Sequence, residues 1–191
     1  MQRGTIIFLN GVSSAGKSTL AKALQARLPD QYFLLSVDLL GEIAPPKGSP
    51  SYDVRFTADP KPVMSALYGC ARTFSDSGLH VIVDTIFAKE AHFALETCLD
   101  VFPDCAYPVV FVHVACPVEE LRRREKKRGD RKIGWAESLL PKLDPQDTYD
   151  ITVDTYHNTI EECAGQIIAS TEDSARHTSF KTLLLQHKNQ T

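Results

Sequence analysis

The sequence lacks several features that would assign it to a class at once. Its five cysteines are an odd number, widely spaced and without a C-x-x-C pair, which argues against a disulfide framework and a zinc site. No apolar run approaches the roughly 20 residues needed to span a bilayer. The net charge of −3 gives no general affinity for nucleic acid or anionic membranes. We therefore expect a cytoplasmic protein with reduced thiols and with neither a nucleic-acid nor a membrane partner, whose oligomeric state the sequence leaves open.

One glycine-rich segment carries a motif. Residues 11–18 have the pattern G-x-x-x-x-G-K-S of a phosphate-binding P-loop, between an apolar run at 5–10 and a leucine-striped segment at 19–28. This strand–loop–helix context favours nucleotide binding over a turn that merely caps a helix. Lys17 would reach the β- and γ-phosphates, and the Ser18 hydroxyl would bind Mg²⁺. The candidate nucleotide-binding residues are Gly11, Val12, Ser13, Ser14, Ala15, Gly16, Lys17, Ser18 and Thr19.

Apolar runs alternate with helix-forming segments along the chain, which predicts an α/β fold with a parallel, helix-covered sheet. The 191 residues suit one domain over 1–170, followed by a tail at 171–191 that is either a docked helix or a frayed end. A proline-rich segment at 45–62 is expected to be a long loop. The expected strands are 5–10, 32–37, 79–83, 109–114 and 149–154, and the expected helices are 19–28, 39–44, 63–77, 88–101, 118–127 and 159–170.

Polar residues end three of these strands. Asn10, Asp38 and Asp84 would meet at the carboxyl edge of the sheet, where ligands of parallel sheets bind. Asp38 is either a base that accepts the proton of an attacking hydroxyl or the N-cap of the next helix, and the two roles are compatible. Asp84 follows an apolar run, as in a Walker B segment that holds Mg²⁺ directly or through water, and a strand-end cap is its alternative.

The most basic stretch of the chain follows the fourth expected strand. Four of its cations, Arg122, Arg123, Lys126 and Lys127, fit a solvated helix face. Arg124, Arg128 and Arg131 recur at about one helical turn and run into a glycine-containing connection, an expected lid over 128–136 that brings guanidinium groups onto the transferring phosphate. Trp135 either stacks on a base or fills the core, and the core is favoured.

Several blocks of sequence together resemble the chloramphenicol phosphotransferase-like family. They are 6–18 with the P-loop, Ser36-Val37-Asp38-Leu39-Leu40, Val81-Ile82-Val83-Asp84, Arg128-Gly129-Asp130-Arg131 with Gly134, Tyr149-Asp150-Ile151-Thr152-Val153-Asp154-Thr155, and Glu161-Glu162-Cys163-Ala164. They occur in order over nearly the whole chain except the tail. The R-G-D-R and Y-D-x-x-V-D-T segments make the resemblance more specific than the P-loop alone.

The resemblance implies a P-loop kinase fold with a five-stranded parallel sheet covered by helices on both faces. It implies a kinase that uses ATP and Mg²⁺ to phosphorylate a hydroxyl of a small molecule, with chloramphenicol as the acceptor of the named member and antibiotic resistance as its role. On this basis Asp38 is the expected base, Lys17, Arg128 and Arg131 the expected phosphate-contacting residues, and Ser18 and Asp84 the expected metal site.

Two departures and two alternatives accompany the resemblance. Thr85 stands where the named member has a second acid, and the 45–62 loop differs in composition. The resemblance therefore supports the reaction better than the acceptor. The alternatives are a nucleotide-dependent regulatory ATPase or switch, and a toxin-like kinase that acts on a nucleotide sugar or a macromolecule.

Overall fold

The computed structural model describes residues 2–50, 59–88, 95–129, 132–143 and 148–190. Five parallel strands form one sheet in the order β2-β3-β1-β4-β5. The elements are β1 (Ile6–Asn10), α1 (Lys17–Arg27), β2 (Tyr32–Ser36), α2 (Val37–Ile43), α4 (Lys61–Asp76), β3 (His80–Thr85), α5 (Leu95–Leu99), β4 (Val109–Ala115), α6 (Val118–Arg128), α7 (Trp135–Leu139), η2 (Leu140–Lys142), β5 (Ile151–Asp154), α8 (Ile160–Thr171), η4 (Ser174–Arg176) and α9 (Ser179–Lys188).

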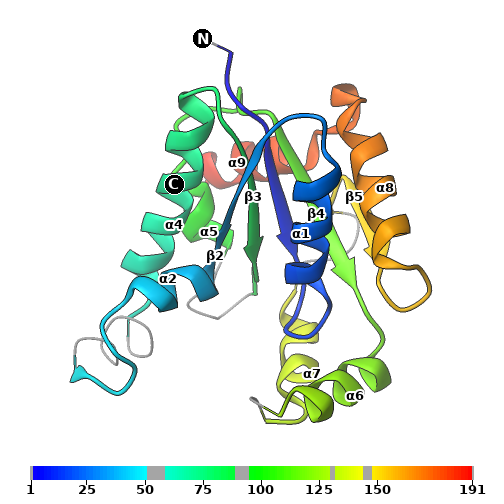
Figure 1. Cartoon of the computed structure of the whole chain (residues 1–191). Coiled ribbons are helices and arrows are strands. Elements are labelled where there is room, and N and C mark those ends of the chain that lie inside the picture. The colour runs from blue at the N-terminus through cyan, green and yellow to red at the C-terminus, as the bar shows by residue number, and fades with distance from the viewer. Residues whose placement is uncertain (1, 51–58, 89–94, 130–131, 144–147, 191) are drawn as a thin grey trace.

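Strand β1 lies at the centre because both of its faces are apolar. All five of its residues are buried, and successive side chains point to opposite sides of the sheet. Ile7 and Leu9 join the core beneath α1 and α8, whereas Ile6 and Phe8 join the core beneath α4, α5 and α9. Figure 1 shows these two helical layers, with all strand arrows pointing to the end of the sheet where α2, α6 and α7 lie. The predicted fold class, a five-stranded parallel sheet covered on both faces, is confirmed.

Most predicted elements appear within a residue or two of their expected bounds. The predicted helix 88–101 is described only as α5, because 89–94 lie outside the described residues. Part of the predicted 45–62 loop, at 51–58, lies outside them as well. Within the described part of the chain, no helix combines the length and apolar character that crossing a bilayer requires.

The C-terminal segment contains helix α9, which packs on the sheet. Phe180 stacks on Phe8 with ring centroids 5.5 Å apart, and Leu184 is fully buried. The carboxylate of Asp150 holds the start of this helix, since it accepts the N–H groups of Thr178 and Ser179 at 3.0 and 2.9 Å. Its other oxygen accepts the N–H of Phe111 in β4 at 2.8 Å.

Replacing Asp150 with alanine is expected to lower the free energy of unfolding by about 2–4 kcal/mol, because three backbone donors lose a charged acceptor together. Urea unfolding of the purified variant measures this. Asp173→Ala is the matched control, because its carboxylate pairs with the exposed Arg176 and such surface pairs contribute less than about 1 kcal/mol. Equal stability of the two variants would contradict the account of α9.

Candidate active site

The P-loop connects β1 to α1 and wraps closely under the neighbouring strand. A side chain at Gly11 would place its Cβ 2.5 Å from the Val114 carbonyl oxygen, so only glycine fits there. Gly16 has φ +95°, a left-handed conformation that glycine adopts without strain, and α1 begins directly after it at Lys17. The first N–H groups of α1 therefore face the loop and form a site for anionic phosphate oxygens.

Three side chains converge where the P-loop meets β3. The Ser18 hydroxyl donates to Asp84 Oδ2 at 2.6 Å, and Lys17 Nζ lies 3.7 Å from Asp84 Oδ1. Lys17 also donates to the Val12 carbonyl at 3.1 Å, and its side chain is only 8% exposed. This geometry brings Lys17, Ser18 and Asp84 together, as the sequence predicts.

The donor set fits Mg²⁺ rather than a transition metal. A hydroxyl and a carboxylate lie side by side at Ser18 and Asp84, and Mg²⁺ in nucleotide sites is held by one or two such oxygens together with substrate phosphates. Among the described residues there is no group of three or more His, Cys, Asp or Glu able to hold a metal ion by themselves. Ser18 and Asp84 would therefore hold the ion jointly with the nucleotide.

The P-loop is held from the other side by Thr155, whose role sequence reasoning missed, and by Arg124. The Thr155 hydroxyl donates to the Ala15 carbonyl at 2.7 Å. Arg124 donates to the Thr155 hydroxyl at 3.1 Å, to its carbonyl at 2.9 Å and to the Ser14 carbonyl at 3.3 Å. Thr155 ends the Y-D-x-x-V-D-T segment and directly follows the last strand, and this position was the signal available in the sequence. Arg124, grouped by its spacing with the phosphate-contacting arginines, is engaged here with the loop itself.

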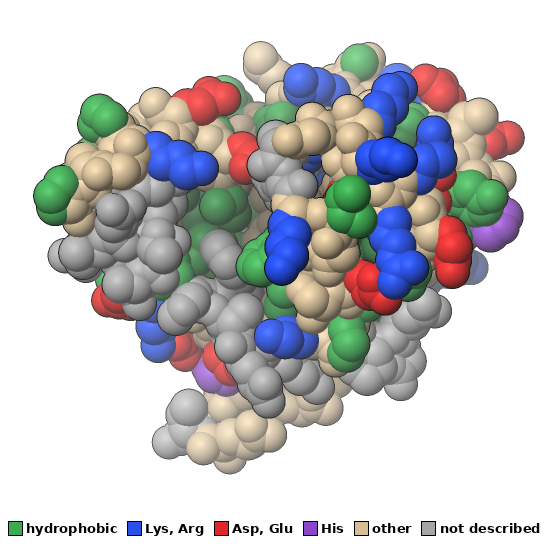
Figure 2. Space-filling view, turned by 90° about the horizontal axis from the view of Figure 1, so that it is seen from below, with side chains coloured by type: hydrophobic (Ala, Val, Ile, Leu, Met, Phe, Trp, Pro, Cys, Tyr) green, Lys and Arg blue, Asp and Glu red, His purple; other side chains and the backbone are tan. Residues whose placement is uncertain are grey.

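A cavity of about 800 Å³ opens at the carboxyl end of the sheet and joins these parts. Figure 2 looks onto this end of the sheet and shows the hollow in the surface there. Its lining falls into three groups. The P-loop side is Ser13, Ser14, Gly16, Lys17, Ser18, Thr19 and Asp84; the side beneath β5 is Arg124, Thr155 and Ile160; the remaining wall is Ser36, Val37, Asp38, Thr85, Ile86, Ala88, Arg128, Trp135, Leu139 and Lys142.

Asp38 lines this cavity from the first turn of α2. The N-cap of α2 is Ser36, whose hydroxyl accepts the N–H of Leu39 at 3.0 Å. The alternative interpretation of Asp38 as the cap is therefore wrong, because the cap is Ser36 and the helix already begins at Val37, one residue before the acid. The carboxylate lies one strand away from Asp84, since Ser36 is the register partner of Asp84 across β2 and β3.

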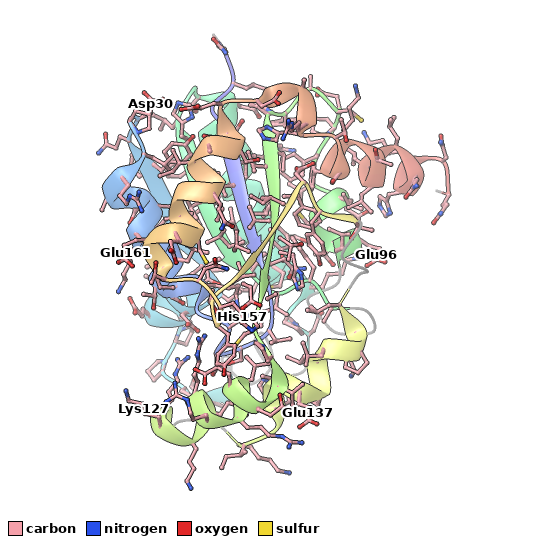
Figure 3. The ribbon with its side chains drawn as sticks, turned by 90° about the vertical axis from the view of Figure 1, so that its right-hand side faces the viewer. Asp30, Glu96, Lys127, Glu137, His157 and Glu161 are labelled. Carbon is pink, nitrogen blue, oxygen red and sulfur yellow. The ribbon has the colours of Figure 1, made fainter. Side chains whose placement is uncertain are left out.

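The basic helix α6 borders the cavity. Figure 2 shows Lys and Arg side chains gathered on this part of the surface, and Figure 3 shows Lys127 and Glu137 on α6 and α7, with His157 on the segment that follows β5. Arg128 lines the cavity, whereas Arg131 lies outside the described residues. The predicted solvated face is present, since Arg122, Arg123, Lys126 and Lys127 are all exposed.

One sequence-based expectation needs correction. Trp135 is 49% exposed and lines the cavity, so the favoured core position is wrong; it begins α7 at the rim and not beneath the sheet. Asn10 ends β1 at the carboxyl edge of the sheet, as predicted; it is fully buried there and is not among the described residues that line the cavity. Its side chain donates to the Tyr149 hydroxyl at 2.6 Å and accepts the Phe87 N–H at 2.7 Å, which ties three segments together.

All five cysteines are free. Burial raises the pKa of the Cys116 thiol, which disfavours the nucleophilic thiolate.

Glu120 orients Arg124 and gives a pH-dependent prediction. Hydrogen bonds from Arg123 and Arg124 lower the pKa of this carboxyl from 4.5 to about 2. A depressed pKa stabilises the fold above about pH 4.5, and this contribution is lost progressively as the pH falls toward 2. We expect Glu120→Gln to flatten the fall of urea-unfolding free energy below about pH 4.5, where the exposed control Glu119→Gln keeps the wild-type slope. A wild-type slope in Glu120→Gln would contradict the pairing of Glu120 with Arg123 and Arg124.

Comparison with known proteins decides the family. The family model for chloramphenicol phosphotransferase-like proteins matches residues 4–172. The chain belongs to that family. The candidate O-phosphotransferase Rv2636 of Mycobacterium tuberculosis is 32% identical, over 87% of this chain and 82% of that protein.

Solved structures agree with the family fold. The Mycobacterium tuberculosis APS kinase CysC, solved with AMPPNP and APS, has a TM-score of 0.69 at 22% identity, over 91% of this chain and 100% of that one. A gluconokinase from Sinorhizobium meliloti has a TM-score of 0.61 at 18% identity, over 94% and 98%. At these identities the likeness shows the P-loop kinase fold. Family and fold together make this chloramphenicol phosphotransferase-like chain a kinase-like phosphotransferase of the P-loop type.

Proposed function

We propose that the chain moves the γ-phosphoryl group of Mg-ATP to a hydroxyl of a small molecule. The observation that carries the proposal is the shared cavity: Lys17, Ser18 and Asp84 line it on one side and Asp38 on another. Phosphoryl transfer needs this combination, a polyphosphate held by one set of groups and a hydroxyl oriented by a separate carboxylate. A regulatory ATPase, in which water replaces the acceptor, needs no separate carboxylate to orient an acceptor hydroxyl.

The roles follow from where each group lies. The P-loop N–H groups and Lys17 hold the β- and γ-phosphates, and Ser18 with Asp84 would hold Mg²⁺, which supplies charge neutralisation when bound. Asp38 accepts the proton of the acceptor hydroxyl while the hydroxyl oxygen forms its bond to the γ-phosphorus. The bond to the ADP oxygen breaks in the same displacement, and ADP leaves. Lys17 and Arg128, with Arg131 by the family resemblance, balance the charge on the transferring group.

The part of the cavity lining near Asp38, where the acceptor would bind, has both polar and apolar residues. Thr85, in the position where the named family member has a second acid, is buried and hydrogen-bonds with the Tyr68 hydroxyl at 3.0 Å. Ile86, Ala88 and Leu139 add apolar surface. Chloramphenicol or a related antibiotic is one candidate acceptor, and an unrelated hydroxyl-bearing metabolite is another.

An ATP-consumption screen over hydroxyl-bearing antibiotics and metabolites tests the proposal, with Asp38→Ala run beside the wild type. We expect ATP turnover to rise with a subset of alcohols and Asp38→Ala to lose that rise. ATP hydrolysis that no alcohol changes would instead support the regulatory ATPase. Turnover with only a nucleotide sugar or a macromolecule would support the toxin-like alternative.

A further inference from the structure

Trp135 is an apolar side chain for which the proposed chemistry has no use. It is the only tryptophan in the 191-residue chain. Nearly half of it, 49%, is exposed, and it lines the cavity together with Leu139 and Ile86. An indole left at a cavity wall keeps a large flat apolar face in water, and covering such a face is favourable. A charged phosphate does not pack on an apolar ring, so the group that would pack on the indole is a non-phosphate part of a ligand.

The backbone on both sides of Trp135 is held by one buried carboxylate. Glu125 in α6 is 1% exposed, and its two oxygens accept the N–H groups of Gly134 at 2.7 Å and Ala136 at 2.8 Å. A buried carboxylate is costly unless it is hydrogen-bonded, so these two bonds define the position of the 134–136 turn. An exposed pair between Arg122 and Glu137, at 2.7 Å, adds a second link from α6 to α7.

The segment that starts with Trp135 runs toward the acceptor side. After α7 and η2, Leu143 forms an antiparallel bridge with Ala88, which follows β3. Strand β3 lies between β1 with the P-loop and β2 with Asp38. The side beneath β5, lined by Arg124 and Thr155, is on the opposite side of the P-loop. This topology places the part of the cavity wall that α7 forms, with Trp135 and Leu139, on the same side as Asp38, where the acceptor would bind.

We propose that Trp135 contacts the acceptor and selects one that carries a flat, unsaturated group next to its hydroxyl, and that Glu125 is the positioning residue for the indole. This inference rests on the proposed function, because it assigns a part of the acceptor site. Offset or edge-to-face packing of a ring on the indole adds about 0.5–1.5 kcal/mol beyond area burial, which a saturated ring of similar size does not gain.

The positioning role is measured without turnover. Because Trp135 is the sole tryptophan, its fluorescence anisotropy and its quenching by acrylamide report this wall alone. Glu125→Gln keeps the side-chain size but has only one carbonyl oxygen for two donors, so we expect acrylamide quenching to rise about twofold and anisotropy to fall. The matched control Glu137→Gln, which removes the exposed pair with Arg122, is expected to keep wild-type values. Unchanged quenching and anisotropy in Glu125→Gln would overturn the positioning role.

The acceptor role is measured by binding two probes to the MgADP-loaded protein. Benzyl alcohol and cyclohexylmethanol carry the same hydroxyl on an unsaturated and a saturated ring. We expect benzyl alcohol to change Trp135 emission saturably, with a millimolar Kd as suits a fragment, and about threefold or more tighter than cyclohexylmethanol. Glu125→Gln should weaken benzyl alcohol binding, while calorimetry shows the same MgADP affinity in wild type and Trp135→Ala. Trp135→Phe, monitored by calorimetry, should restore most of the benzyl alcohol affinity that Trp135→Ala loses.

Three results would overturn the acceptor role: no saturable response to benzyl alcohol, equal binding of the saturated probe, or a tenfold loss of MgADP affinity in Trp135→Ala. The last would place Trp135 on the nucleotide. These binding measurements need no phosphoryl transfer. The proposed function itself would fail if the acceptor screen gave no phosphorylated product, so the two failures can be told apart.

Discussion

Replacing Lys17 with alanine is expected to lower kcat by roughly 10²–10³-fold, equivalent to about 2.7–4 kcal/mol of transition-state stabilisation. The Lys17 side chain is 8% exposed and its ammonium lies between the Val12 carbonyl and Asp84, so it is held in place before the nucleotide binds. A charge fixed in a partly dry site stabilises developing negative charge more than a mobile one. Steady-state kinetics with any acceptor from the screen, and MgATP calorimetry, measure the loss.

Lys22→Ala is the matched control, because Lys22 is an exposed residue of the same helix. We expect it to keep kcat within about twofold, since surface changes of this kind have small effects. A melting temperature for each variant separates misfolding from lost chemistry. A folded Lys17→Ala protein that binds MgATP normally and stays active would contradict the P-loop assignment.

Asp38→Asn is expected to reduce kcat by about 10²–10⁴-fold while the KM for ATP changes little. Asparagine keeps the shape of the carboxylate but cannot accept the hydroxyl proton. Helix α2 is expected to persist, because its cap is the Ser36 hydroxyl and not the acid. The nucleotide side is a strand away, which is why the effect should fall on the acceptor step. Separate titrations of ATP and acceptor measure the split between kcat and the two KM values.

Glu42→Gln, at an exposed position of the same helix, serves as its control and is expected to behave as wild type. If Asp38→Asn turns over at the wild-type rate, Asp38 is not the base. If it raises the KM for ATP without lowering kcat, Asp38 belongs to the nucleotide side.

The fold was predictable because its signals are local. The first four residues of β1 are apolar, as expected for a strand that is buried on both faces, and the P-loop glycines lie where the backbone geometry demands them. The pairing of Ser18 with Asp84 followed from the P-loop motif, which ends at Ser18, and from the acid near the end of the neighbouring strand β3. No such rule separates the side chains that line a cavity from those that lie beneath it, and Trp135 was therefore wrongly placed in the core.

The braces of the site were beyond sequence reasoning because each depends on residues far apart in the chain. Thr155 reaches Ala15 across 140 positions, and nothing in the composition around either residue indicates that contact. Glu125 is one acid within a run of charged residues, where pairing with a neighbouring arginine or lysine is the ordinary expectation. Its actual partners are the backbone N–H groups of Gly134 and Ala136, whose positions depend on how the chain folds back after α6.

The most direct test of the central claim uses ATP labelled at its γ-phosphate and an acceptor that raises ATP turnover in the screen. The account predicts that the label appears on the acceptor hydroxyl with the wild type, and that both Lys17→Ala and Asp38→Asn reduce this transfer by about two orders of magnitude or more. Label recovered only as inorganic phosphate, at a rate that neither the acceptor nor Asp38→Asn changes, would contradict it.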